Sequence, residues 1–286
     1  MAQNIYTLKM NEADAAELFA AWKEYRTEKA PAYARWQLRP ENCVITCYES
    51  GKVVFQGKDA HVYASPFLTE TEDRLPQAGS DEVGTGDYFG PVVVSACIVR
   101  EEDLPLIRDL GIRDSKALSD QKIMEAAPVL MEKLVHTKLI VDNEKYNRIH
   151  EKYNMNEIKA LLHNQAYINL SKKGALPSFR VIDQFMPEAA YYRALRNEPE
   201  VIGQMHFETK AENKYPAVGA ASVIARYTFL QCMHRMDEKY GMHFSLGAGS
   251  AADASAREFV KRYGTEELRH TAKVHFRNTE ALRSQD

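Results

Sequence analysis

The sequence lacks any uninterrupted apolar run long enough to cross a membrane, and residues 1–4 lack the pattern of a signal peptide. Cysteine is also scarce, and none of the pairing typical of a zinc site is present among Cys43, Cys47, Cys97 and Cys232. Cys97 lies in an apolar run, where a reduced and buried thiol is expected. We therefore expect a cytoplasmic protein that does not bind a membrane.

An excess of positive charge is missing as well. The 37 lysine and arginine residues are outnumbered by 40 acidic residues, which gives a net charge of −3 and an isoelectric point near 6.3. Phosphate binding requires clustered lysine and arginine, so a nucleic-acid partner would have to be bound by local patches rather than by overall charge. Acidic residues committed to a metal site would lower the net charge without opposing such a partner.

The most distinctive segment is residues 79–91, which contain four glycines and end in a proline. This composition predicts a backbone that turns sharply or lies close to another group. The residues that follow, 92–99, are rich in valine and isoleucine and predict a buried strand. Asp81 and Glu82 are adjacent near the start of the segment. An acidic pair that stands alone is usually a solvated turn, but two later segments change this interpretation.

Each of these later segments carries an acidic residue in an apolar setting. Asp183 lies near the end of the strand-like residues 179–185, and Glu212 precedes a long helical pattern rich in alanine. Acidic residues gathered from separate strand and helix ends can hold hard divalent cations through oxygen ligands. The sequence therefore predicts a metal site, and the alternative is that the acids only shape the fold.

These motifs resemble, in order and over nearly the whole chain, those of bacterial ribonuclease HIII within the type 2 ribonuclease H group. The matching motifs are Asp81-Glu82, Asp87-Tyr88-Phe89-Gly90-Pro91, Asp114-Ser115-Lys116, residues 154–166, the Asp183 strand, Lys210-Ala211-Glu212 and Val274-His275-Phe276-Arg277-Asn278-Thr279. The resemblance implies an α/β ribonuclease H-like catalytic domain, a mixed sheet with helices, preceded by a small α+β domain similar to the TATA-binding protein. Glu212 departs from the aspartate usual in the broader group and fits the type 3 branch.

The resemblance also implies the chemistry. Four residues match the family's catalytic acids and metal ligands, namely Asp81, Glu82, Asp183 and Glu212. They would hold Mg²⁺ or Mn²⁺, two ions with substrate bound, and two such ions roughly 4 Å apart support phosphodiester hydrolysis. Asp81 and Asp183 are the expected shared ligands, and the main-chain carbonyl of Glu82 is a further candidate.

Substrate binding is implied for two other motifs. Gly84, Thr85 and Gly86 match the turn that contacts ribose hydroxyls beside the scissile phosphate, and Ser115 and Lys116 match a phosphate-contacting element. RNA paired with DNA is read through groove shape and 2′-hydroxyls rather than through base edges.

Several other polar residues have two interpretations. Asp87 is either a metal ligand or a cap for a backbone donor, and the cap is favoured. His275 stands between two apolar residues, so for it and for His270 we favour a packed, structural role over proton transfer. The polar side chains of the helix predicted at residues 156–170, including His163, are candidates for substrate contact.

Three parts are predicted along the chain. Residues 1–65 alternate as strand, helix and several strands, residues 66–78 contain two prolines and form a linker, and residues 79–286 form the catalytic domain. The first domain has polar positions among its strands, at Arg35, Gln37, Arg39, Thr46, Tyr48, Lys52 and Gln56. These form either a solvated face or a platform for nucleic acid, and the resemblance favours the platform.

Alternating strands and helices indicate an α/β second domain. The pattern predicts a helix from Ser119 toward Val135, strands at residues 137–141 and around Val201 and Ile202, and a long helix after Pro216.

The function implied is that of an endonuclease that hydrolyses the RNA strand of RNA/DNA hybrids and leaves 5′-phosphate and 3′-hydroxyl ends. One alternative is a type 2 ribonuclease H that acts at single ribonucleotides embedded in DNA. The other is a hybrid-binding protein without catalysis. The partner in each case is a nucleic-acid duplex, no obligate protein partner is evident, and a monomer is expected.

Overall fold

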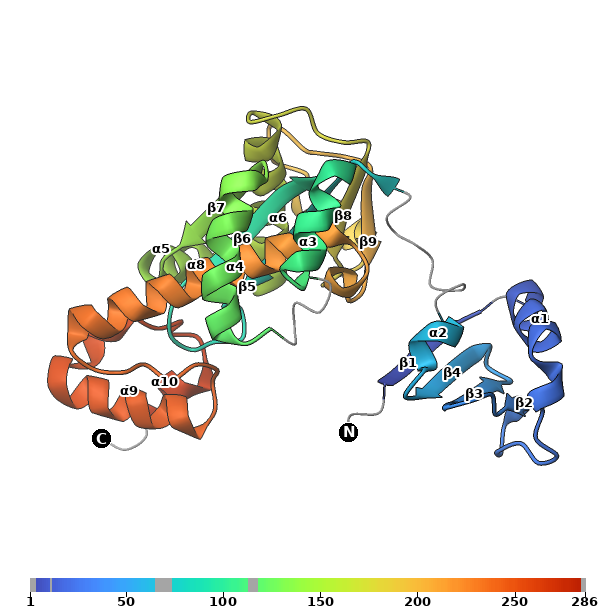
Figure 1. Ribbon diagram of the computed structural model, residues 1–286. Helices are drawn as coiled ribbons and strands as arrows, with labels where there is room; N and C mark the ends of the chain where they lie inside the picture. Colours follow the sequence, from blue (N-terminus) through green and yellow to red (C-terminus); the bar gives the residue numbers. More distant parts are fainter. Residues whose placement is uncertain (1–3, 11, 65–73, 113–117, 284–286) are drawn as a thin grey trace. The chain divides into compact units, whose positions relative to one another are not determined.

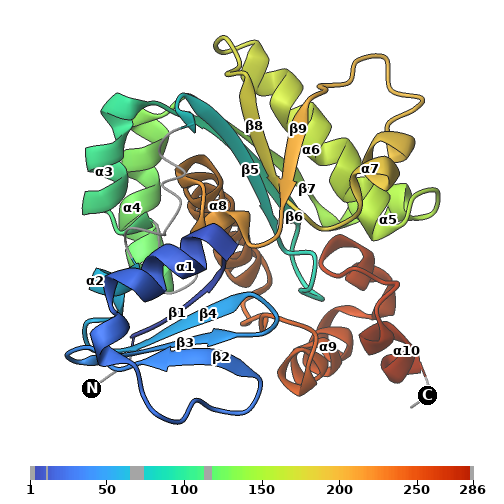
Figure 2. The same ribbon diagram turned by 90° about the vertical axis from the view of Figure 1, so that its right-hand side faces the viewer.

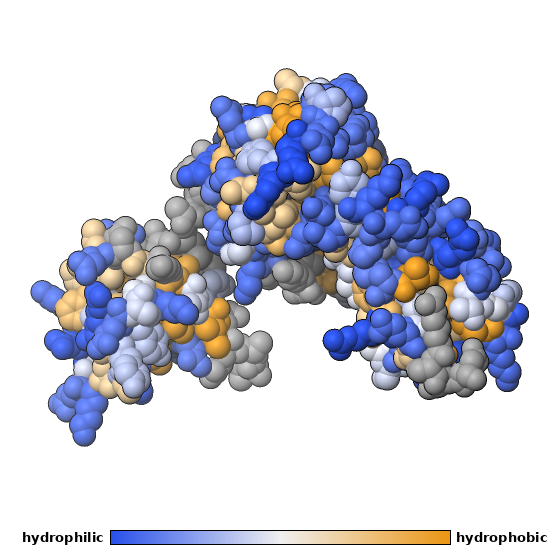
Figure 3. Space-filling model, turned by 180° about the vertical axis from the view of Figure 1, so that it is seen from behind, coloured by the Kyte–Doolittle hydropathy of each residue, from blue (hydrophilic) through white to orange (hydrophobic). Residues whose placement is uncertain are grey.

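The computed structural model describes residues 4–10, 12–64, 74–112 and 118–283, and its chain divides into two compact units, residues 1–70 and 71–286 (Figure 1). Ser115 and Lys116, which the sequence predicts as substrate contacts, lie outside the described residues. Within those residues no helix is both long and apolar enough to span a membrane. The face seen in Figure 3 is mostly hydrophilic, with hydrophobic residues in small groups.

The first unit is an antiparallel sheet with helices on one face. Its elements are β1 (Asn4–Lys9), α1 (Glu12–Ala21), β2 (Ala34–Leu38), β3 (Cys43–Tyr48), β4 (Lys52–Gly57) and α2 (Ala60–Ala64). The strand order is β1-β4-β3-β2, and α1 lies across one face (Figure 2). Alternate residues such as Cys43, Ile45 and Cys47 are buried with Leu18 of α1, because successive strand side chains point to opposite faces.

The polar residues that were predicted to form a platform do not all lie together in this sheet. Gln37 donates to Thr46 Oγ1 at 3.0 Å, and Arg39 donates to Gln37 at 3.4 Å, so these three form one group. Arg35 instead pairs with Glu12 of α1 at 3.5 Å, beside a break in the β2–β3 register. Lys52 and Gln56 are exposed. The first unit is the expected small α+β domain.

The second unit is built on a five-stranded mixed sheet in the order β7-β6-β5-β8-β9. The strands are β5 (Gln77–Val83), β6 (Val92–Val99), β7 (His136–Val141), β8 (Phe179–Asp183) and β9 (Met205–Glu208). The β5–β6 and β6–β7 pairs are antiparallel, whereas the β5–β8 and β8–β9 pairs are parallel. The carboxyl ends of β5, β8 and β9 therefore meet at one edge of the sheet.

Helices cover both faces of this sheet. The helices of this unit are α3 (Leu104–Asp109), α4 (Asp120–Lys133), α5 (Asn143–His150), α6 (Met155–Ser171), α7 (Glu188–Ala194), α8 (Pro216–Tyr240), α9 (Ser250–Tyr263) and α10 (Arg277–Arg283), and its 3-10 segments include η6 (Ala211–Asn213) and η7 (Thr265–His270). Figure 2 shows α3, α4 and α8 on one side of the sheet and α6 on the other.

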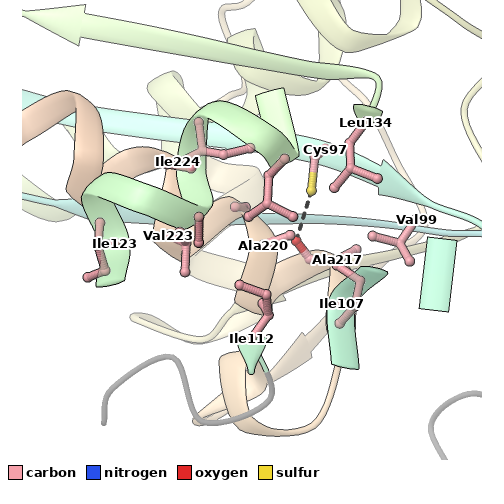
Figure 4. Packing of buried hydrophobic residues seen from close by; sticks show 14 of the residues in the cluster. Cys97, Val99, Ile107, Ile112, Ile123, Leu134, Ala217, Ala220, Val223 and Ile224 are labelled. Atoms are coloured by element: carbon pink, nitrogen blue, oxygen red, sulfur yellow. Dashed lines mark hydrogen bonds between the residues drawn. The ribbon is translucent and has the colours of Figure 1, made fainter. Parts of the chain in front are cut away.

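The α8 side is closely packed, as Figure 4 shows. There Cys97 of β6 is buried and its thiol donates to the carbonyl of Ala217 in α8 at 3.1 Å, so the expected reduced, buried thiol is confirmed. Gly79 has no room for a side chain, because a Cβ there would lie 2.4 Å from the nitrogen of Val218. The glycine lets α8 press directly against β5.

Most predicted elements of this unit are confirmed. The Ser119 hydroxyl caps α4 by accepting from the nitrogen of Lys122, and Pro216 opens α8. The strand predicted around Val201 and Ile202 is wrong, since β9 begins only at Met205.

The error has a physical reason. The side chain of Asn164 in α6 donates to the carbonyl of Glu200 and accepts from the nitrogen of Ile202, so a side chain takes the backbone bonds that a strand would use. At the other end of the unit, β5 begins at Gln77, inside the range predicted as a linker; residues 66–73 of that range lie outside the described residues.

Candidate active site

Two of the predicted acids lie side by side at the ends of neighbouring parallel strands. Ser80 of β5 pairs with Ile182 of β8, so the next residues along the two strands, Asp81 and Asp183, are adjacent and point to the same face. This is the face covered by α8, whose Ser222 donates a hydrogen bond to the Asp81 carboxylate. Asp81 is only 9% exposed.

Glu212 reaches the same region from the segment before α8. It lies in η6 and is 2% exposed. The neighbouring residue ties this segment to β8, because the nitrogen of Ala211 donates to Asp183 Oδ1 at 3.0 Å. Three acids from two strands and one helical turn are thus placed at the carboxyl edge of β5 and β8.

The fourth acid, Glu82, has its side chain on the opposite face, which α6 covers. Its carboxylate accepts from Lys159 and lies 2.9 Å from Nε2 of His163, and both partners come from α6. Nδ1 of His163 is in turn 2.7 Å from the hydroxyl of Ser80. The ammonium group of Lys159 is also 4.0 Å from the ring centroid of Phe185. Strand alternation thus sends two adjacent acids in opposite directions.

The two carboxylates differ in electrostatics. Burial raises the pKa of Asp81 well above its usual range, and the negative charges of Glu82 and Asp183 raise it further. Burial acts in the same direction on Glu82, but His163 and Lys159 together outweigh it, and the pKa of Glu82 is lowered. A cation beside Asp81 would favour its charged form, whereas Glu82 already has Lys159 as a cationic partner.

The fit of these residues to a metal is partial. Within the described part of the chain, no three histidine, cysteine or acidic side chains are gathered closely enough to hold an ion. Asp81, Asp183 and Glu212 supply carboxylate oxygens, which are the ligands that Mg²⁺ and Mn²⁺ prefer. Binding an ion between them requires their side chains to turn toward each other. Glu82 can join without leaving α6 only through its main-chain carbonyl.

The glycine-rich turn follows directly after these acids. Gly84 and Gly90 have positive φ angles of 89° and 82°, and a Cβ at Gly84 would lie 2.1 Å from the carbonyl oxygen of Pro91. Both positions therefore require glycine. Gly86 at the tip is exposed, and a Cβ there would have nothing within 4 Å. The tip is open to a large partner.

Asp87 has the capping role that was favoured, since its Oδ1 accepts from the nitrogen of Gly247 at 2.6 Å.

The expectation for His275 is wrong in part, because the residue is exposed and its ring stacks on that of His150, with the ring centroids 3.8 Å apart. Its neighbour His270 is 3.4 Å from Glu144. His150 and His275 line a separate cavity of about 700 Å³, together with Glu144, and none of the four acids is part of its lining.

Similarity to known proteins extends over nearly the whole chain. Residues 78–279 match the family model Ribonuclease HII, and residues 6–79 match a Domain of unknown function (DUF3378). The chain is 39% identical to ribonuclease HIII of Streptococcus gordonii over 96% of each chain. It belongs to the ribonuclease HIII family. Ribonuclease HIII of Bacillus licheniformis is also 39% identical, over 86% of this chain and 87% of that protein.

Solved structures agree with the assignment to ribonuclease HIII. Bst-RNase HIII in complex with Mn²⁺ superposes with a TM-score of 0.74 at 34% identity, over 98% of both chains. Ribonuclease H2 from Pyrococcus horikoshii superposes with a TM-score of 0.62 at 23% identity and shares the fold of the second unit. The resemblance and the fold class expected from the sequence are therefore confirmed.

Sequence reasoning missed the partners of Glu82. Lys159 and His163 are four residues apart in α6 and both are buried. The signal was present, because two basic residues at this spacing share one helix face, and the face is otherwise apolar. His163 was interpreted as a candidate substrate contact, but its burial excludes that role.

Proposed function

We propose that this chain is an endoribonuclease that hydrolyses the RNA strand of RNA/DNA hybrids in a divalent-metal-dependent reaction, leaving 5′-phosphate and 3′-hydroxyl ends. The observation that carries the proposal is the adjacency of Asp81 and Asp183 on parallel strands, next to an exposed glycine turn. Family membership supports the same activity.

The proposed ligands are Asp81, Asp183 and Glu212 through their carboxylates and Glu82 through its main-chain carbonyl. Bound Mg²⁺ or Mn²⁺ ions, two with substrate present, would supply an activated water and would stabilise charge on the phosphate. Lys159 and His163 neutralise the Glu82 carboxylate on the far face of the sheet. They thereby remove one negative charge that would repel the substrate phosphates.

Substrate recognition is proposed for the turn that follows β5. Its open tip, Thr85 and Gly86, suits close approach to ribose hydroxyls, which distinguish RNA from DNA. Ser115 and Lys116 are proposed phosphate contacts from the family resemblance. In the first unit, the exposed Lys52 and Gln56 belong to the proposed nucleic-acid platform.

One gel tests this function directly. An RNA/DNA hybrid, a DNA duplex that contains one ribonucleotide and a plain DNA duplex of the same sequence are each incubated with Mg²⁺ and with Mn²⁺. We expect cleavage within the RNA of the hybrid and no cleavage of plain DNA. Cleavage of plain DNA, or of none of the three duplexes with either metal, contradicts the proposed function.

A further inference from the structure

Lys273 is a lysine without exposed surface, in the segment between η7 and α10. Its Nζ donates to two main-chain carbonyls, that of Asp87 at 2.8 Å and that of Gly90 at 2.6 Å. Burying an ammonium group is strongly unfavourable, and replacing buried charges by well-packed apolar residues is often neutral or stabilising. Fold stability alone therefore does not account for a lysine at this position.

Both carbonyls belong to the second half of the glycine turn. The backbone of the C-terminal segment runs beside this half, with Lys273 donating to the carbonyl of Tyr88 at 2.9 Å and Gly90 donating to that of Thr271 at 3.0 Å. Asn143 of α5 adds a second side-chain donor to the carbonyl of Gly90, at 2.9 Å. Residues 87–90 are thus attached to the segment around Lys273 and to α5, in addition to Gly247, which donates to Asp87 Oδ1 and accepts from the nitrogen of Tyr88.

The first half of the turn is attached differently. Gly84 packs against Pro91 and Phe229, but the tip at Gly86 projects into open space. A short turn with an unsupported tip takes its position from its fixed end. The orientation of Thr85 and Gly86 relative to the acids of β5 therefore depends on how the carbonyls of Asp87 and Gly90 are held.

We propose that Lys273 is a positioning residue that holds the turn at residues 84–90 in the orientation that reads the ribose of the RNA strand. It acts only through the carbonyls of Asp87 and Gly90, because its burial keeps it from touching the substrate. This inference rests on the proposed function, since it assumes that the turn contacts RNA.

The test uses the full chain with Lys273→Met, which keeps a long unbranched side chain, one atom shorter than lysine, and removes the donors. The matched control is Tyr240→Phe at the C-terminal end of α8. The Tyr240 hydroxyl donates to Glu267 at 2.7 Å, and the Tyr240 side chain lies in the buried apolar cluster that also contains Tyr88 and Phe89. For each variant we measure the melting temperature, kcat and KM on a hybrid, and the ratio of affinities for hybrid and for DNA duplex without divalent metal.

Lys273→Met is expected to lower the hybrid-to-DNA affinity ratio by about fivefold, the equivalent of one lost hydrogen bond. A misplaced turn should also lower kcat/KM by roughly tenfold or more at a temperature where the variant is folded. Tyr240→Phe should lower the melting temperature and leave the ratio unchanged. A Lys273→Met variant that melts lower but keeps both ratio and kcat/KM overturns the proposal.

Asn143→Ala decides the question if Lys273→Met does not fold. It removes the other donor to Gly90 and is expected to lower the same affinity ratio, whereas an unchanged ratio overturns the proposal. The wild-type chain separates this inference from the proposed function. If the wild type does not prefer hybrid to DNA, the proposed function fails, but a preference that neither variant alters overturns the role of Lys273 alone.

Discussion

Nε2 of His163 lies 2.9 Å from the carboxylate of Glu82, while Nδ1 of the same ring lies 2.7 Å from the hydroxyl of Ser80. Because an ionised carboxylate only accepts hydrogen bonds, Nε2 must carry a proton. In a neutral ring Nδ1 then accepts from Ser80. The histidine thus connects two residues of β5 that point to the same face, and it fixes the side chain next to Asp81.

Removing His163 should reveal how strongly His163 and Glu82 are coupled. His163→Phe leaves the Glu82 carboxylate buried with Lys159 alone, and we expect the free energy of unfolding to fall by about 1–3 kcal/mol. In the double variant with Glu82→Gln the loss should be smaller than the sum of the single losses, since the unpaired charge is gone. Urea denaturation of the wild type, the two single variants and the double variant measures these free energies of unfolding. Additive losses would mean that His163 and Glu82 are not coupled.

The first unit should contribute binding rather than chemistry. It has its own sheet and apolar core, so deleting residues 1–65 should leave a folded nuclease with weaker affinity for hybrid. Its loss should also reduce the salt dependence of binding, because fewer counterions are released per complex. Affinity measured at several salt concentrations tests both points, and equal affinity of the short and full chains rules out the platform.

Lys273 should make stability depend on pH. Burial lowers its pKa to about 7, although the Asp87 charge opposes this shift. The unfolded chain then binds more protons between pH 7 and the ordinary lysine pKa, so the free energy of unfolding should rise with pH across that range. The size is on the order of a few kcal/mol, at about 1.4 kcal/mol per pKa unit.

The comparison that isolates this effect is between the wild type and Lys273→Met, by urea denaturation at pH 7 and at pH 9. The other groups that face Lys273, namely Asp87, Tyr146 and His275, are present in both proteins. Burial, His150 and Lys273, in that order, lower the pKa of His275 to about 4; burial and His150 remain in the variant, so His275 should not titrate between pH 7 and pH 9 in either protein. The wild type should gain more stability than the variant between the two pH values. Equal gains would show that the lysine keeps an ordinary pKa.

Thr85 should set the preference between two kinds of substrate. The resemblance to the type 2 group implies an arginine between the glycines for reading a lone ribonucleotide, whereas this chain has Thr85 there, which offers only a hydroxyl. We expect efficient cutting within runs of ribonucleotides and poor incision at a single one, especially with Mg²⁺. Two otherwise identical duplexes test this, and comparable cleavage efficiency on both would place the enzyme among the junction-cutting ribonucleases.

Part of this site could be predicted from the sequence. The apolar run that leads to Asp183 predicts a strand that ends in an acid, and β8 confirms it. Residues 77–80 before Asp81 are Gln-Ala-Gly-Ser, which do not form an apolar run, so the sequence did not predict β5 or its parallel pairing with β8. The partners of the Glu82 side chain could not be predicted from the sequence, because they depend on which helix covers which face of the sheet. The wrong prediction of a strand at Val201 and Ile202 has a similar cause. The side chain of Asn164, which is distant in sequence, accepts a hydrogen bond from the nitrogen of Ile202, and the sequence pattern does not predict this contact.

We propose that the acids on the α8 face of β5 and β8 carry the cleavage of RNA paired with DNA. The most direct measurement compares the wild type with Asp81→Asn and Asp183→Asn, recording turnover of a labelled hybrid at saturating Mg²⁺ and, separately, hybrid affinity. Removing one group that stabilises transition-state charge should lower turnover by at least about a hundredfold. Affinity should stay the same or rise, because a negative charge near the phosphates is lost. Unimpaired turnover by either variant would contradict the account.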